Sequence, residues 1–405
     1  MSAPDTYGEI VKRQFGKNRP AVWSLRFLLV AFLIATYAPV LALNIPFWTN
    51  LEGVEGSPWF ASLFNPFVFD QTVDIFFNVL MFALPVLVGI VLATRGPTRR
   101  ILIALWVVAH VATFLWFSNN QERFRESPRD WIGEIHVADA SALFPPIRHH
   151  PIERKSEFTL TGPFSKGRLQ KGAEPPADEL WPFYLLGSDD VGNDVFTRML
   201  YGTRISLTIG IVAVVLYVTV GVLMGGIAGY FGGWVDDVIM FVAQVFMTIP
   251  ALFLILFLLS LTKERSIFYI MFIIALLNWP YVMRLVRGEF LRQRAIDYVA
   301  ASKALGYSPS RIMFRHIAPN SMAPVFVSAT FGVAAAILIE STISFLGLGD
   351  PSAPSWGQLL KVGADSGTLG RHLIYTAGFG IFVTVLVLNL IGEGLRDALD
   401  PKLKK

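Results

Sequence analysis

Eight apolar segments, each close to the length that crosses a membrane as a helix, constrain this chain more than any other feature. They cover residues 24–43, 77–93, 101–117, 205–228, 238–261, 267–284, 324–345 and 373–392. A 20-residue helix is about 30 Å long, which matches the hydrocarbon core of a bilayer. Only 16% of the 405 residues are charged, against roughly 25% in soluble domains. We therefore expect an all-α polytopic membrane protein with about eight transmembrane helices.

Basic residues indicate which side of the membrane each connection occupies. Lysines and arginines gather before the first apolar segment, in residues 94–100 and in residues 285–323, whereas residues 44–76 contain none. Short basic connections stay in the cytoplasm, so we expect the N-terminus, both basic connections and the C-terminus there. Cleavage of the first segment as a signal peptide after Ala42 is the alternative. The long basic region before that segment and the interruption by Pro39 favour an uncleaved span.

Three regions follow from this pattern. Residues 1–117 contain the first span and a hairpin, residues 118–182 form an extracytoplasmic insert, and residues 183–401 form a transmembrane core with a cytoplasmic loop at 285–323. In the insert, His136, His149 and His150 do not have the spacing of metal ligands. We expect these histidines to be solvated surface side chains, and we expect no metal site.

A polar stretch, residues 297–320, separates two of the apolar segments. We expect a first short helix over about 295–305 that ends at Gly306, since glycine favours a left-handed helix stop. Ser308 and Pro309 then cap and begin a second helix over 309–316, and Pro319 is expected to end the unit because it lacks an N–H. Alanines and a serine on the first helix would let another surface approach closely. A docking surface and a merely solvated loop both remain open at this point.

This stretch resembles the cytoplasmic coupling motif of ABC importer permeases: Glu-Ala-Ala, three residues, Gly, nine residues, then Ile-x-Leu-Pro. Gly306 and Pro319 lie at the motif's spacing, whereas Ala300, Ser302, His316 and Ala318 replace its Glu, second Ala, Ile and Leu. Residues 186–207, 344–357 and 391–401 are similar, in order, to segments of oligopeptide and dipeptide permeases of the C type. Residues 15–28, with Trp23-Ser24-Leu25, resemble the Yej-type branch. The hairpin 77–117 has no counterpart and is interpreted as an addition.

The resemblance implies the permease subunit of an ATP-driven peptide importer in the bacterial inner membrane. It implies a heterodimer with a second permease subunit, ATPase subunits on the cytoplasmic face, an extracytoplasmic peptide-binding protein, a peptide substrate and membrane lipid as partners, and no cofactor. It also implies that ATPase coupling involves ten residues of the loop: Asp297, Tyr298, Ala300, Ala301, Lys303, Gly306, Arg311, Arg315, His316 and Pro319.

Two further features lie inside the apolar segments. Glu340 is an acid within such a segment, where a charge usually faces a cavity or a partner. We expect it in the translocation path or gate, with snorkelling to the membrane interface as the alternative. Gly221, Gly225 and Gly229 form a stripe of small residues, which indicates close helix packing within this subunit rather than a specific dimer face.

The sequence contains no GxxxxGK[ST] phosphate loop, HExxH motif or nucleophile elbow, so we expect a transport subunit rather than an enzyme, with ATP hydrolysis on its partners. A net charge of +4 is too small to indicate nucleic-acid binding. The alternatives are an importer permease for another small solute such as nickel complexes, an ATP-independent secondary transporter, and a membrane-bound enzyme or assembly factor.

Overall fold

The computed structural model describes residues 7–54, 56–153, 155–167, 182–261 and 265–400. Residues 168–181 of the expected insert and the C-terminal residues 401–405, which were expected in the cytoplasm, lie outside the described residues.

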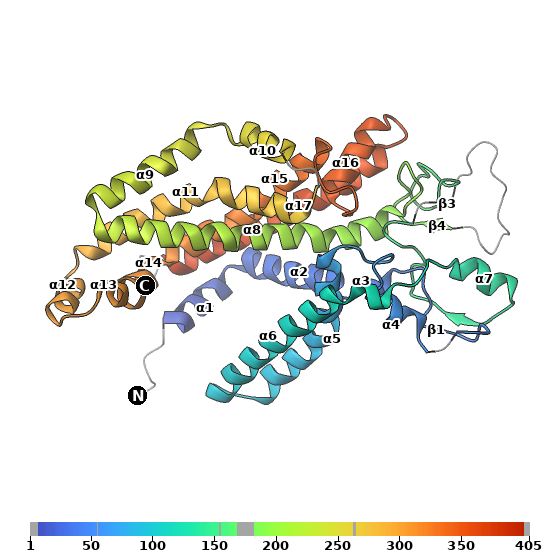
Figure 1. The fold of residues 1–405 in the computed structure, drawn as a ribbon, viewed down its shortest axis with the longest axis horizontal. Helices are drawn as coiled ribbons and strands as arrows, with labels where there is room; N and C mark the ends of the chain where they lie inside the picture. Colours follow the sequence, from blue (N-terminus) through green and yellow to red (C-terminus); the bar gives the residue numbers. More distant parts are fainter. Residues whose placement is uncertain (1–6, 55, 154, 168–181, 262–264, 401–405) are drawn as a thin grey trace. The chain divides into compact units, whose positions relative to one another are not determined.

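Membrane-length helices dominate the described residues (Figure 1). Seven described helices are long and apolar enough to cross a bilayer: α2 (Arg19–Thr36), α5 (Thr72–Ala93), α6 (Gly96–Asn119), α8 (Val195–Phe231), α11 (Ile267–Arg294), α15 (Ala323–Phe345) and α17 (Arg371–Leu399). The bent pair α9 (Gly233–Thr248) and α10 (Ala251–Ser260) brings the number to eight if it counts as one span. The expected all-α polytopic class is therefore confirmed. Several helices continue beyond their apolar segment, since α8 begins at Val195 and α11 ends at Arg294.

The span expected over residues 238–261 is divided into two helices. The chain bends by 85° between α9 and α10. Pro250 has no N–H to donate and excludes the α conformation from the residue before it. Ile249 accordingly has an extended backbone and ends α9, and Pro250 itself is the N-cap of α10. The first expected span is also shorter than predicted, because α2 ends at Thr36 and a separate turn, α3 (Ala38–Leu41), contains Pro39.

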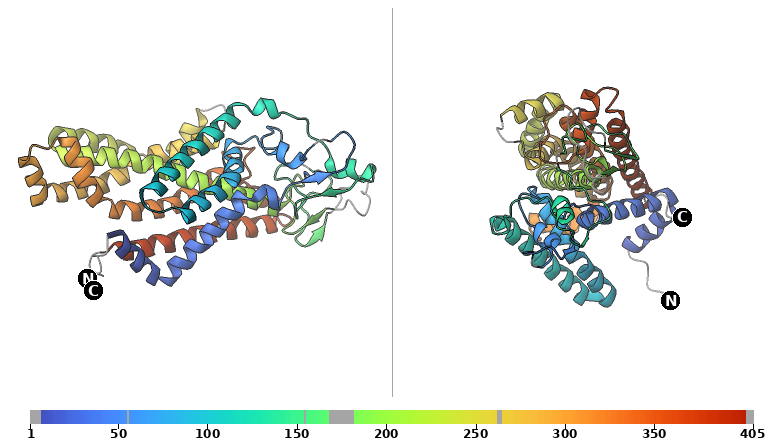
Figure 2. Two further views of the ribbon diagram at one scale, coloured as in Figure 1. Left: turned by 90° about the horizontal axis from the view of Figure 1, so that it is seen from below. Right: turned by 90° about the vertical axis from the view of Figure 1, so that its right-hand side faces the viewer.

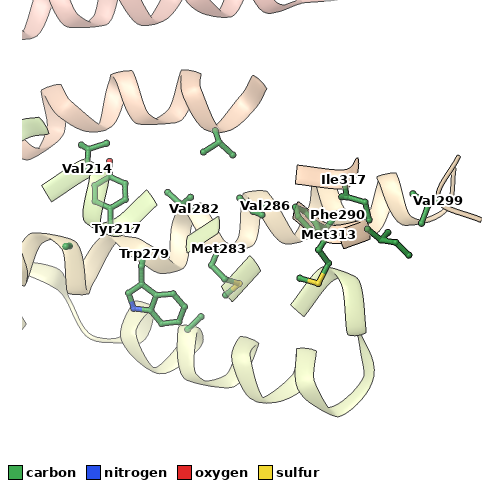
Figure 3. Packing of buried hydrophobic residues seen from close by; sticks show 14 residues of the cluster. Val214, Tyr217, Trp279, Val282, Met283, Val286, Phe290, Val299, Met313 and Ile317 are labelled. Atoms are coloured by element: carbon green, nitrogen blue, oxygen red, sulfur yellow. The ribbon is translucent and has the colours of Figure 1, made fainter. Parts of the chain in front are cut away.

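The chain divides into two compact units, and unit 1 contains Met1–Leu29, Leu207–Asp350 and Ile381–Lys405. Its core is a buried cluster of apolar residues on α8, α11 and the polar loop (Figure 3). At the start of the unit, α1 (Tyr7–Lys17) and α2 lie beside the last turns of α17 (Figure 2). There Asn18 donates a hydrogen bond to Asp397 at 3.3 Å, and Gly394 leaves room for Ala21.

The glycine stripe of α8 packs against α11 of the same chain. A Cβ at Gly221 would lie 2.6 Å from Val282, and one at Gly225 would lie 2.4 Å from the main-chain oxygen of Met283. Both distances are shorter than any normal carbon contact, so only glycine permits this approach of the two helices. The prediction that the stripe packs within one subunit is confirmed.

Unit 2 contains Val30–Ser206 and Pro351–Gly380. Besides α3, α5 and α6, it holds the short elements β1 (Trp48–Thr49), α4 (Pro58–Ser62), η1 (Gln121–Phe124), α7 (Trp131–Val137), β2 (Ala142–Leu143), β3 (Ser165–Lys166), β4 (Phe183–Tyr184) and α16 (Trp356–Asp365). Strand β1 pairs antiparallel with β2, and β3 pairs antiparallel with β4. The insert that begins at residue 118 thus shares a sheet with residues 48–49.

A buried arginine connects the hairpin of α5 and α6 to the rest of unit 2. Arg204 on α8 is fully buried and donates to Asp74 and Asn78 of α5, both at 3.0 Å. It also donates to the carbonyl oxygens of Ala35 at 2.7 Å and Thr36 at 3.2 Å. A buried charge is tolerated only when it is paired and hydrogen-bonded, and Arg204 meets both conditions. The sequence interpretation missed this pair, because Asp74 and Arg204 are 130 residues apart in the chain.

Candidate functional site in the loop between α11 and α15

The polar loop, residues 297–320, folds into short helices at the end of unit 1 where α8 turns into α9 (Figure 1). Its first helix, α12, spans Asp297–Ala304. Val299 and Ser302 face inward, whereas Ala300, Ala301 and Lys303 are exposed. The hydroxyl of Tyr298 donates to Gln293, near the end of α11, at 2.9 Å. This bond anchors the start of α12 to the helix that precedes it.

Gly306 ends α12 as the sequence predicts. Its φ is +74°, in the left-handed region where glycine has no Cβ penalty. The N–H of Gly306 donates to the carbonyl of Lys303 at 2.9 Å, and the N–H of Tyr307 donates to the carbonyl of Ser302 at 3.2 Å. These two bonds form a Schellman motif, which satisfies carbonyls at the end of the helix.

The second helical segment begins as predicted and continues further than predicted. Ser308 accepts a hydrogen bond from the N–H of Arg311 and caps α13 (Pro309–Arg311). The chain then widens into a π-helical turn, η3 (Ile312–Ile317), and returns to α-helix in α14 (Ala318–Ser321). The expectation that Pro319 ends the unit is wrong. Pro319 lies in the first turn of α14, where the N–H that proline lacks is not needed.

Three stacked side chains join the two halves of the loop. The guanidinium carbon of Arg311 lies 4.0 Å from the ring centroid of Tyr307. The Tyr307 ring also stacks on His316, with centroids 5.6 Å apart and planes 13° from parallel. Tyr307 directly follows the turn at Gly306, so this stack fixes the angle between α12 and the segment that follows.

The inward face of the loop belongs to the core of unit 1 (Figure 3). Val299, Ile312, Met313 and Ile317 are buried in the same cluster as residues of α8 and α11. Removing a side chain of this size from a core typically costs about 2–5 kcal/mol. The loop is therefore held by apolar packing as well as by its own hydrogen bonds.

Polar contacts attach the same end of α11 to its neighbours. Arg287 donates two hydrogen bonds to the carboxylate of Asp236 on α9, each at 2.5 Å. Arg294 donates to the carbonyl oxygen of Tyr230 on α8 at 2.8 Å, and the ammonium of Lys303 lies 5.7 Å from the centroid of the Tyr230 ring. These contacts join the end of α11 to α8 and α9, and Lys303 joins the loop to α8.

The outward face combines basic and apolar side chains. Eight of the ten predicted coupling residues are exposed, and Tyr298 and His316 are half-buried. Two large apolar residues that the sequence interpretation missed are also exposed: Leu305 at 71% and Phe314 at 55%. Their signal was visible in the sequence, because both are large apolar side chains within a polar loop.

Glu340 lies on α15, away from the loop. It follows Ser321 by 19 positions in the chain, which corresponds to roughly 28 Å along a helix. The side chain is 1% exposed, and its Oε1 accepts a hydrogen bond from Ser344 at 2.7 Å. The alternative that Glu340 snorkels to the interface is therefore wrong.

Two histidines of unit 2 are also placed differently from the expectation. His149 and His150 are buried rather than solvated. Nε2 of His150 lies 2.9 Å from the carbonyl oxygen of Val68, and its Nδ1 accepts from the N–H of Ile152 at 3.2 Å. Burial lowers the pKa of His150 to about 4, so this imidazole is neutral at pH 7. Both ring nitrogens are occupied by main-chain groups.

These features define a multi-pass helical membrane protein with a folded, exposed loop fixed to one end of its bundle. The family model described as "Binding-protein-dependent transport system inner membrane component" matches residues 221–405. The oligopeptide transport system permease protein OppC of Bacillus subtilis is 38% identical over 244 residues, which cover 60% of this chain and 78% of the relative. The dipeptide permease protein DppC of the same organism is 34% identical, over 72% of this chain and 93% of the relative.

The glutathione transport system permease protein GsiD of Pectobacterium atrosepticum is 36% identical, over 60% of this chain and 78% of the relative. The chain belongs to the family of binding-protein-dependent inner membrane permeases, in its oligopeptide and dipeptide branch. It is a multi-pass inner membrane protein and a transport subunit.

Proposed function

We propose that this chain forms half of the translocation pathway of an ATP-driven peptide importer, and that residues 297–320 couple this pathway to ATPase subunits. One observation supports the coupling role above all. The inward face of the loop shares a buried cluster with α8 and α11, so a force on its outward face moves these helices rather than only the loop. The relatives named for oligopeptides, dipeptides and glutathione support a peptide substrate.

In this proposal the exposed face of the loop contacts the ATPase subunits. The small side chains of Ala300 and Ala301 permit close approach, and Leu305 and Phe314 add apolar contact area. Closure of the ATPase pair on ATP displaces the loop, and the attached helices tilt. The pathway then changes from inward-facing to outward-facing and accepts peptide from an extracytoplasmic binding protein. A second permease subunit completes the heterodimer.

The sidedness of the chain is part of the same proposal. Residues 94–100, residues 285–323 and the C-terminus lie in the cytoplasm, as their lysines and arginines indicate. Residues 121–179, of which 154 and 168–179 are not among the described residues, lie on the extracytoplasmic side of the membrane. This insert contacts partners at the surface and does not form the pathway. Shortening it should leave assembly of the complex intact, and loss of assembly would refute its peripheral role.

Glu340 is proposed as a gate residue that acts from within the bundle. Its burial and its hydrogen bond to Ser344, one turn later on α15, support a role in setting the shape of this helix. A residue that lines an open path would be exposed in this chain, so direct contact with peptide is not part of the proposal.

Purification followed by reconstitution tests the proposed function. The tagged chain should co-purify with a second permease and with ATPase subunits. Proteoliposomes that contain this complex should take up peptide only with ATP and the binding protein. Uptake by the lone chain without ATP would refute the importer and indicate a secondary transporter. A nickel complex taken up in preference to peptides would refute the substrate.

A further inference from the structure

Unit 2 contains a cavity of about 250 Å³ whose lining includes residues of α4 and α7. Its walls come from three segments, residues 44–68, 126–131 and 150–153. All three lie outside the membrane-length helices, between α2 and α5 or after α6. Small-molecule sites usually begin at roughly 300 Å³. This cavity therefore suits a group the size of one amino-acid residue rather than a whole peptide.

The apolar part of the wall is fixed in place. Ile45, Val68 and Trp131 line the cavity. Trp131 begins α7, whose first turn is capped by Asp130, with the N–H of Gly133 donating to Asp130 at 3.1 Å. The cap fixes the main chain at Trp131, and the guanidinium carbon of Arg129 lies 5.0 Å from the centroid of the indole ring. An apolar side chain of a ligand would find a prepared surface here.

The charged part of the wall is acidic. Glu126, Glu153 and Arg129 line the cavity. Arg129 is neutralised by Glu134 at 3.1 Å, and Glu153 pairs with Lys155 at 3.1 Å. Among the described residues, Glu126 has no ion-pair partner, and its main-chain carbonyl is fixed by a 2.9 Å bond from the amide of Asn65. The remaining charge at the cavity is thus one carboxylate held on an ordered segment.

The histidine in the wall does not reduce this negative charge. His150 lines the cavity, but its two ring nitrogens are occupied by Val68 and Ile152. It is therefore a neutral wall element near pH 7. A ligand for this cavity needs a cationic group next to an apolar group.

We propose that this cavity binds the amino-terminal residue of a short peptide, with its ammonium group at Glu126 and its side chain against Ile45, Val68 and Trp131. The choice of a peptide rests on the proposed function, whereas the ammonium and the apolar group follow from the wall. The cavity is a site on the extracytoplasmic side that receives one end of the substrate apart from the translocation path.

Calorimetric titration of the purified complex, without ATP or binding protein, tests this proposal. The probes are the tripeptide Leu-Gly-Gly and its N-acetylated form. The free tripeptide should bind, and acetylation should weaken binding about five- to tenfold, as expected for loss of one partly exposed charged hydrogen bond. Glu126→Gln should weaken binding of the free tripeptide by the same factor and leave the acetylated form unchanged.

Glu52→Gln is the matched control. Glu52 is an exposed carboxylate of the same unit that does not line the cavity, so this variant should bind like the unmodified protein. Equal affinity for the free and acetylated tripeptides, or no effect of Glu126→Gln, would overturn the proposal. The acetylated peptide Ac-Gly-Lys-Gly has its only ammonium group on the lysine side chain. If it binds as tightly as Leu-Gly-Gly, the site recognises basic side chains, and the proposal is also overturned. Because transport does not enter this measurement, failure here leaves the proposed importer function intact.

Discussion

Replacement of Gly306 separates a change in backbone conformation from a change in packing. The residue has a φ of +74°, and a Cβ built on it meets no atom within 4 Å. The whole penalty of a side chain at this position is therefore conformational. It amounts to about 1–2 kcal/mol for alanine, and we expect more for a β-branched residue such as valine.

This conformational penalty is small compared with the stability of the whole fold, but it is large enough to change the conformation of the loop. The core that α8, α11 and the loop share is held by many buried side chains, so the subunit should still insert and assemble. A penalty of one or two kcal/mol nevertheless changes the ratio of two conformations by a factor of about 5–30. The least costly way to relieve the strain at residue 306 is to break the two Schellman hydrogen bonds to the carbonyls of Ser302 and Lys303. Their loss would reorient α12 relative to the segment that follows it.

We expect Gly306→Val to retain normal membrane levels and to abolish both uptake and the stimulation of ATP hydrolysis by the binding protein, and Gly306→Ala to lose part of each. Gly288 supplies the matched control. It is exposed on α11, also meets nothing within 4 Å and has no left-handed φ, so Gly288→Ala should be harmless. Normal stimulated hydrolysis together with normal uptake in Gly306→Val would remove the coupling role from this loop.

Four other predictions concern separate parts of the chain. Arg204→Leu leaves the buried Asp74 carboxylate without its partner and should destabilise unit 2 by about 3–5 kcal/mol. Thermal unfolding in detergent measures this loss, and the double variant with Asp74→Leu should recover most of it. Tyr307→Leu removes the stack and should reduce stimulated ATP hydrolysis, whereas Tyr307→Phe should not; equal activity of the two variants would contradict the stack's role. The pKa of His150 is about 4 in the fold, below its ordinary value of 6.5. The unfolded chain therefore binds more protons than the folded chain, and the free energy of unfolding should fall as the pH decreases from about 6.5 to about 4. His150→Gln should flatten that dependence. A cysteine at Thr98 should resist an impermeant reagent applied from outside, and labelling there would contradict the proposed sidedness.

The number of spans and the local features of the loop were predictable from the sequence. Apolar length alone identifies a membrane span, and Gly306 and Ser308 act on their immediate neighbours. The bend at Pro250 was not readable from the proline alone, because Pro85 and Pro280 lie inside α5 and α11 without ending either helix.

Other features depend on contacts that local sequence does not reveal. His149 and His150 look like surface residues beside each other, and only the folded outer segments bury them. The role of Arg204 depends on Asp74, a partner 130 residues away. Pro319 is expected to stop a helix because it lacks an N–H, but it lies in the first turn of α14, where that N–H is not needed. The π-helical turn before it, which buries Ile312, Met313 and Ile317, has no local signal in the sequence.

The π-helical turn also restricts the length of this part of the chain. Each residue of a helix rotates the next by about 100° and advances it by about 1.5 Å. Insertion of a further residue between Ile312 and Ile317, where the π-helical turn already holds one residue more than an α-turn, would rotate everything before it by that angle relative to α15. Ile312 and Met313 could then no longer stay buried together with Ile317. Substitutions should therefore be tolerated in η3 wherever a side chain is exposed, while a further insertion should not be tolerated anywhere within it.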